Sequence, residues 1–132
     1  QRWAGSLKTA RTDTTWHANK QMDAFSSIPN HTGFTARNLF MDRQGILRGG
    51  AFAKIAPGGG PLSPHRHAHA HLFIVTRGTI SVMLDGEERT VHEYESQLVP
   101  GGVLHAVWNR NTEPAEILGL TLETPSSPTS SI

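Results

Sequence analysis

The run His65-Arg66-His67-Ala68-His69-Ala70-His71 places a histidine at every second position near the middle of the chain. A fifth histidine, His105, follows the turn Pro100-Gly101-Gly102. Alternate residues of an extended strand project to one face, so several of these rings can converge on one point. Because imidazole is the commonest side-chain ligand for divalent metals, the spacing predicts a specific metal site rather than a solvated polyhistidine tract.

The sequence around this run is typical of an all-β protein. The chain has 132 residues with 13 glycines and 8 prolines, which lie between short apolar runs. Strands are predicted at 34–41, 46–55, 71–77, 79–84, 88–92, 96–99, 104–109 and 115–122, with Asp85-Gly86 suited to a type I′ turn. The glycine-rich segment 57–61 is predicted to be a loop. This many short strands indicates a sandwich or barrel, and a small jelly roll brings His105 beside the histidine run.

The length allows one domain. We expect an N-terminal arm at residues 1–33, a β-barrel at 34–124 and a flexible, Ser/Pro/Thr-rich tail at 125–132. The arm carries Trp3, Trp16 and Phe25, which are expected to pack on the barrel or on a neighbouring subunit.

Composition excludes several classes of protein. The net charge is +1 without a basic stripe, so no nucleic-acid partner is expected. No apolar run reaches the length of a membrane span, so no membrane partner is expected. The absence of cysteine excludes disulfides and thiolate ligands. We expect a cytoplasmic protein, although a leader preceding Gln1 is compatible with the sequence.

Two spaced motifs resemble those of the cupin superfamily. Gly59, His65-x-His67, His71 and Gly78 match the first cupin motif in spacing, except that His71 stands where that motif usually has Glu. Pro100-x-Gly102-x-x-His105-x-x-x-Asn109 matches the second, with Tyr94 in place of its leading Gly. The chain thus resembles a small single-domain metal-binding cupin in a four-histidine variant.

The resemblance implies a cupin-type jelly-roll β-barrel that binds one divalent metal through His65, His67, His71 and His105. It also implies a homodimer. Four imidazoles without an anionic ligand leave the site at charge +2 and favour nitrogen-preferring transition metals, so we expect Fe(II) foremost, with Zn, Ni, Cu or Mn as alternatives. His71 has a second interpretation, as a general base beside a three-histidine site.

Further site residues are predicted from strand faces. Phe73 and Val75 continue the inward face after His71, and Val107 shares the face of His105, so these three are expected to form an apolar substrate wall. His69 and Gln97 are candidate catalytic residues, His69 with a surface position as its alternative and Gln97 as a donor to a bound oxygen.

An earlier strand offers a candidate binding face for an anionic substrate. Arg48, Phe52 and Lys54 alternate along it, and an inward Arg48 would clamp a carboxylate while Phe52 contacts the substrate. The alternative places the charges outward.

Three functions follow for a small-molecule substrate. The first is a non-haem dioxygenase that cleaves a chelating enolate, carboxylate or catecholate. The second is a redox-neutral lyase, isomerase or cyclase that uses the metal as a Lewis acid. The third is a non-enzymatic metabolite-binding cupin. Acidic side chains fall mainly in turns, so a carboxylate base is scarce, which favours oxygen chemistry.

Overall fold

The computed structural model describes residues 24–123, which form nine strands without a helix. The strands are β1 (Ser26–Ser27), β2 (His31–Met41), β3 (Leu47–Pro61), β4 (Ala70–Arg77), β5 (Ile80–Leu84), β6 (Glu87–Val91), β7 (Ser96–Val99), β8 (His105–Trp108) and β9 (Ala115–Leu122). The all-β prediction is confirmed. Within this range no helix is long and apolar enough to cross a membrane.

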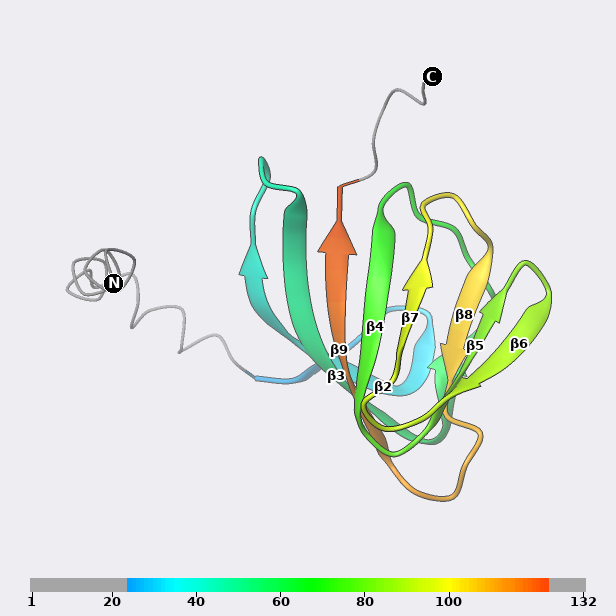
Figure 1. The fold of residues 1–132 in the computed structure, drawn as a ribbon. Coiled ribbons are helices and arrows are strands. Elements are labelled where there is room, and N and C mark those ends of the chain that lie inside the picture. The colour runs from blue at the N-terminus through cyan, green and yellow to red at the C-terminus, as the bar shows by residue number, and fades with distance from the viewer. Residues whose placement is uncertain (1–23, 124–132) are drawn as a thin grey trace.

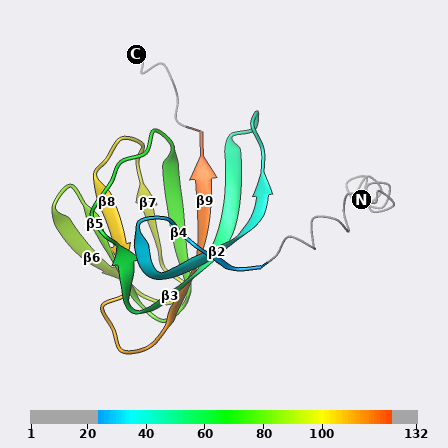
Figure 2. The ribbon, with the colours of Figure 1, turned by 180° about the vertical axis from the view of Figure 1, so that it is seen from behind.

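The strands form two antiparallel sheets that curve toward one another (Figures 1 and 2). The larger sheet has the order β1-β2-β3-β9-β4-β7, and the smaller has the order β6-β5-β8. Sequence neighbours are therefore separated in space: β9 lies between β3 and β4, although it comes last in the chain. This crossing connectivity closes a short jelly-roll barrel with one face of each sheet turned inward.

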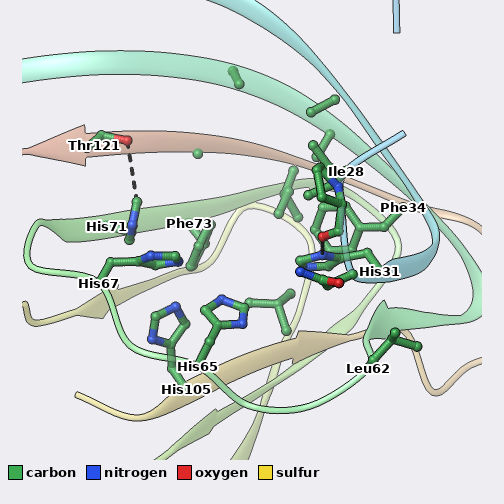
Figure 3. A pocket seen from close by; sticks show the side chains of 18 of the residues that line it. Ile28, His31, Phe34, Leu62, His65, His67, His71, Phe73, His105 and Thr121 are labelled. Atoms are coloured by element: carbon green, nitrogen blue, oxygen red, sulfur yellow. Dashed lines mark hydrogen bonds between the residues drawn. The ribbon is translucent and has the colours of Figure 1, made fainter. Parts of the chain in front are cut away.

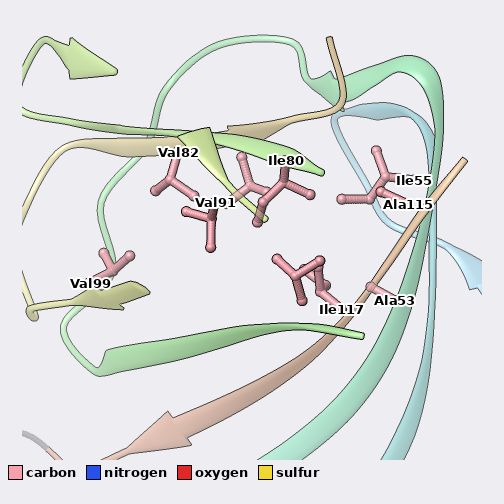
Figure 4. Packing of buried hydrophobic residues seen from close by; sticks show 10 residues of the cluster. Ala53, Ile55, Ile80, Val82, Val91, Val99, Ala115 and Ile117 are labelled. Carbon is pink, nitrogen blue, oxygen red and sulfur yellow. The ribbon is translucent and has the colours of Figure 1, made fainter. Parts of the chain in front are cut away.

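The barrel interior is divided between a packed core and a hollow. β-branched residues from both sheets meet in the core, where Ile55, Val75, Ile80 and Val82 have no exposed surface (Figure 4). These residues belong to the short apolar runs from which the strands were predicted. Val75, expected to contact substrate, belongs to this core.

The segment 57–61 is strand, so its prediction as a loop was wrong. β3 continues through Pro61, and Gly60 and Pro61 pair with Thr32 and His31 of β2. Gly60 lies against the Trp108 ring, where a Cβ atom would come within 2.0 Å of a ring carbon. Gly60 thus reflects close packing, whereas Gly58 has a φ of +80° and open space beside it.

This end of β3 also joins the two sheets. The Gly58 amide donates to the Asn109 carbonyl at 2.7 Å, and the Asn109 amide donates to Gly59 at 2.9 Å. The buried Asn109 side chain donates to the carbonyls of Ile55 and Glu113 and accepts from the Asn111 amide. Asn109 is therefore a structural junction between the sheets.

The N-terminal boundary differs from the prediction. β2 begins at His31, and β1 pairs with it, so residues 26–27 and 31–33 of the expected arm belong to the larger sheet. Phe25 lies under the Lys54 ammonium, 4.3 Å from the ring centroid. Trp3, Trp16 and the expected tail at 125–132 fall outside the described residues.

Candidate metal centre

Three of the predicted ligands come together in the barrel. The nearest ring nitrogens of His65, His67 and His105 all lie within 4.8 Å of one another. Ring centroids are 4.6 Å apart for His65–His67 and for His65–His105, and 5.2 Å apart for His67–His105. Imidazole nitrogens at this separation can share one ion with small side-chain adjustments.

The cluster is built by pairing across the barrel, not by a continuous histidine strand. His65 forms an isolated bridge with His105, each amide donating to the other carbonyl at 2.9 Å. The Gly102 amide donates to the His67 carbonyl at 2.7 Å. β4 begins only at Ala70, so the preceding histidines lie on an irregular segment. Backbone hydrogen bonds join this segment to Gly102 and His105.

His71, the first histidine of β4, adjoins this three-histidine cluster. Its ring centroid is 5.2 Å from that of His67 and 6.1 Å from that of His105. The ring stacks on Phe73 at 5.8 Å, and its Nδ1 lies 3.4 Å from the Thr121 hydroxyl (Figure 3). Both interpretations of His71, as fourth ligand and as base, remain open in this geometry.

The surroundings lower the pKa of His65, His67 and His71. Burial, together with the neighbouring His67 and His105, lowers the pKa of His71 to about 4. Burial also lowers the pKa of His65 and His67, and His105 adds to both shifts. A neutral imidazole has the lone pair that a metal needs, so lowered pKa values protect metal binding against acid.

The orientation of His105 is fixed by a second contact. Its Nδ1 lies 2.9 Å from the Val103 carbonyl oxygen, so Nδ1 carries the proton and Nε2 is left as the coordinating atom. His105 is 3% exposed, which makes it the most enclosed member of the cluster. A compact set of imidazole nitrogens, with one ring oriented by the backbone, fits a divalent transition metal.

The cluster opens into a cavity of about 650 Å³ (Figure 3). Most of its wall is apolar and comes from β2, β3, β4, β8 and β9 together with the loop after β1. Phe73 and Val107 line it, as expected. The polar lining consists of Asn30, His31, Ser63, His65, His67, His71, His105 and Thr121, and no charged carboxylate, lysine or arginine of the described chain lines it.

Arg48 and Phe52 lie outside this cavity. The Arg48 guanidinium forms an ion pair with Glu123 and donates to the Gly45 carbonyl at 2.7 Å. It lines a neighbouring hollow of about 410 Å³ that shares Ala51, Gly119 and Thr121 with the main cavity. Phe52 occupies the opposite face of β3 from Ala51 and Ala53, which do line the cavity. The expected carboxylate clamp is therefore not part of the cavity wall.

His69 and Gln97 are also placed away from the cluster. His69 is exposed, lines the neighbouring hollow and lies 3.9 Å from the Glu123 carboxylate. The Gln97 amide donates to the Leu98 carbonyl at 2.9 Å, and Gln97 does not line the main cavity. Neither side chain reaches the cluster in this structure.

His31 is a cavity residue to which the sequence assigned no role. It begins β2 opposite Pro61, which brings its ring to 5.8 Å from the ring of His65. It belongs to neither cupin motif, so only the register of β2 against β3 reveals its position. Ile28, Phe34 and Leu62 were missed for the same reason.

Comparison with known proteins agrees with this architecture. The sequence-family model for the cupin domain matches residues 51–121. This range includes β4 through β8 and all four predicted ligands. No curated protein matches the chain.

Solved structures of low sequence identity share the fold. A predicted oxalate decarboxylase from Thermotoga maritima has a TM-score of 0.68 at 16% identity, over 77% of this chain and 94% of that one. The polyketide cyclase RemF from Streptomyces resistomycificus has a TM-score of 0.66 at 20% identity, over 80% and 78%.

The cupin domain of an XRE family transcriptional regulator from Enterobacter cloacae has a TM-score of 0.62 at 22% identity, over 71% of this chain and 100% of that one. These names cover enzymes and a regulator, so they indicate fold and not activity. With two motifs, a jelly-roll topology and a family model that spans more than half of its length, the chain belongs to the cupin family.

Proposed function

We propose that this cupin is a metal-dependent dioxygenase that binds a small, largely apolar substrate through a chelating pair of oxygens. The observation that carries the proposal is a cluster of three histidines that opens into a cavity of about 650 Å³, whose described lining includes no carboxylate, lysine or arginine. Such a cavity suits a neutral or singly ionised enol, diketone or catechol better than a simple carboxylate, because no cation is present to bind a second charge.

The residues of the chain have distinct roles in this proposal. His65, His67 and His105 hold the ion, and His71 beside Thr121 completes its surroundings. A bound Fe(II) would supply a Lewis acid and a redox centre through which electrons of the chelated substrate reduce dioxygen. Phe73 and Val107 hold the apolar part of the substrate and exclude water from the reacting end.

The lining supports oxygen chemistry over the redox-neutral alternative. Elimination, isomerisation or cyclisation needs a group that moves protons near neutral pH. No carboxylate lines the described cavity, so proton transfer there would depend on histidine side chains. Oxidative cleavage by dioxygen depends less on a proton-transfer residue of the protein. Non-enzymatic metabolite binding remains as an outcome of the test.

The proposal is tested by anaerobic reconstitution with Fe(II), followed by nitric oxide binding monitored by EPR. Oxygen uptake is then measured with a panel of β-diketones and catechols. We expect an iron–nitrosyl signal that substrate perturbs, and oxygen uptake matched by product. Turnover without oxygen supports a redox-neutral enzyme instead. Substrate binding without turnover under either condition supports a metabolite-binding protein.

A further inference from the structure

His31 lies on the wall of the cavity that faces the histidine cluster. Ile28, Phe34 and His31 gather on one side of the cavity, across from His67 and His71 (Figure 3). The His31 ring is partly buried and makes an edge contact with Phe34, with centroids 4.8 Å apart at 66°. Packing therefore holds a polar ring on a wall that is otherwise largely apolar.

One hydrogen bond defines which ring nitrogen is available. His31 Nδ1 lies 2.8 Å from the Pro29 carbonyl oxygen. A carbonyl oxygen only accepts, so Nδ1 must carry the proton, and Nε2 of the neutral ring is left with a lone pair. No hydrogen bond joins Nε2 to another residue in the described part of the chain. A partly buried acceptor of this kind gains a hydrogen bond when a ligand brings a donor.

We propose that His31 is a substrate-positioning residue whose Nε2 accepts a hydrogen bond from a substrate hydroxyl that does not bind the metal, on the side of the cavity beside His65, whose ring lies 5.8 Å away. The inference rests on the proposed function, because it takes the chelating end of the substrate to lie at the histidine cluster. His31 is not needed as a ligand, since the nitrogens of His65, His67 and His105 already converge.

The proposal defines the substrate more closely. One end carries two chelating oxygens, the middle is a flat apolar body in contact with Phe34 and Phe73, and a further hydroxyl that does not bind the metal is the donor to His31. Charged groups are excluded from the middle, because the described lining offers no countercharge. A polyhydroxylated aromatic molecule of two or more fused rings meets these requirements.

The test compares two probes on the full chain loaded with Zn(II), which prevents oxidation of the probes. 2,3-Dihydroxynaphthalene has the chelating pair alone, whereas 2,3,6-trihydroxynaphthalene adds a remote hydroxyl. Dissociation constants are measured by calorimetry or by naphthalene fluorescence. We expect the wild type to bind the triol roughly three- to ten-fold more tightly than the diol, as one buried neutral hydrogen bond allows.

Two variants assign the preference to His31. His31→Phe retains a ring against Phe34 but lacks the acceptor, so the preference for the triol should disappear while the diol binds as before. Asn30→Ala alters the neighbouring cavity residue and should retain the preference. A merely structural role for His31 would weaken both probes equally.

The outcomes separate the two proposals. If neither probe binds to the zinc-loaded wild type, the chelating site of the proposed function is wrong, and this inference with it. If the diol binds but the wild type shows no preference for the triol, the role of His31 alone is wrong, whatever the variants do. A preference that persists in His31→Phe also overturns it.

Discussion

His105 combines three structural roles in one residue. Its backbone pairs with that of His65, and its Nδ1 lies against the Val103 carbonyl oxygen. Its ring is the member of the histidine cluster that β8 contributes. The other two ligands lie on an irregular segment whose position depends on this bridge. At the scale of single residues, the site therefore depends most on His105.

Replacing His105 with Ala should lower metal affinity by at least about 100-fold, because it removes one of three converging nitrogens. Metal content after dialysis against a weak chelator, measured by mass spectrometry, checks this. His69→Ala is the matched control: His69 belongs to the same run but lies outside the cluster, so its metal content should equal that of the wild type. Full metal content in His105→Ala would contradict the ligand assignment.

Asn109 should contribute strongly to the unfolding free energy of the barrel. Its amide satisfies two carbonyls at 2.9 and 2.8 Å, and its side-chain oxygen accepts from the Asn111 amide at 2.9 Å. Asn109→Ala leaves these buried groups without partners and should cost about 2–4 kcal/mol of unfolding free energy. Chemical denaturation measures this loss, and an unchanged midpoint would refute the junction role.

At the scale of elements, most strands could be predicted from sequence, but the shape of the site could not. Short apolar runs between turn residues predicted β4, β5 and β9, and the Asp85-Gly86 turn is confirmed by positive φ at both residues. The strand character of 57–61 was missed because it depends on contact with Trp108, 47 or more residues away. The histidine run looked like a strand, yet its rings converge through pairing with β8.

Gly60 offers a test of the packing that extends β3. An added Cβ would meet the Trp108 ring at 2.0 Å, so Gly60→Ala should destabilise the barrel by about 1–3 kcal/mol through overpacking. Gly86→Ala is the control, because Gly86 lies in an open turn with φ +90° and no atom within 4 Å of the added carbon. Its loss should be smaller, about 1 kcal/mol. Thermal denaturation that ranks the two variants in the reverse order would contradict this packing.

At the scale of the whole molecule, the barrel encloses an uncharged cavity with a histidine cluster on its wall. The cupin motifs were sufficient to predict the three converging ligands. They could not predict His31, Ile28 or the exclusion of Arg48, because these depend on how β2 and β3 pair and on the ion pair with Glu123. The homodimer and the identity of the metal remain predictions from resemblance and ligand chemistry.

The enclosed histidines predict a pH dependence for the stability of the metal-free protein. The pKa of His71 is 6.5 in the unfolded chain and is lowered, chiefly by burial, to about 4 in the folded one. Between these values the unfolded state binds more protons, so stability is full above pH 6.5 and falls as pH drops toward 4. Denaturation midpoints from pH 7.5 to 4.5 measure the slope, and His71→Phe should flatten it. An equal slope in that variant would show that His71 is not the cause.

One ion should be held where His65, His67 and His105 meet. Anomalous diffraction from crystals of the zinc-loaded or iron-loaded protein tests this directly. We predict a single strong peak about 2.0–2.2 Å from a ring nitrogen of each of these residues, with the distance to His71 deciding between ligand and base. A metal peak elsewhere, or none at the cluster in fully loaded protein, would contradict the account.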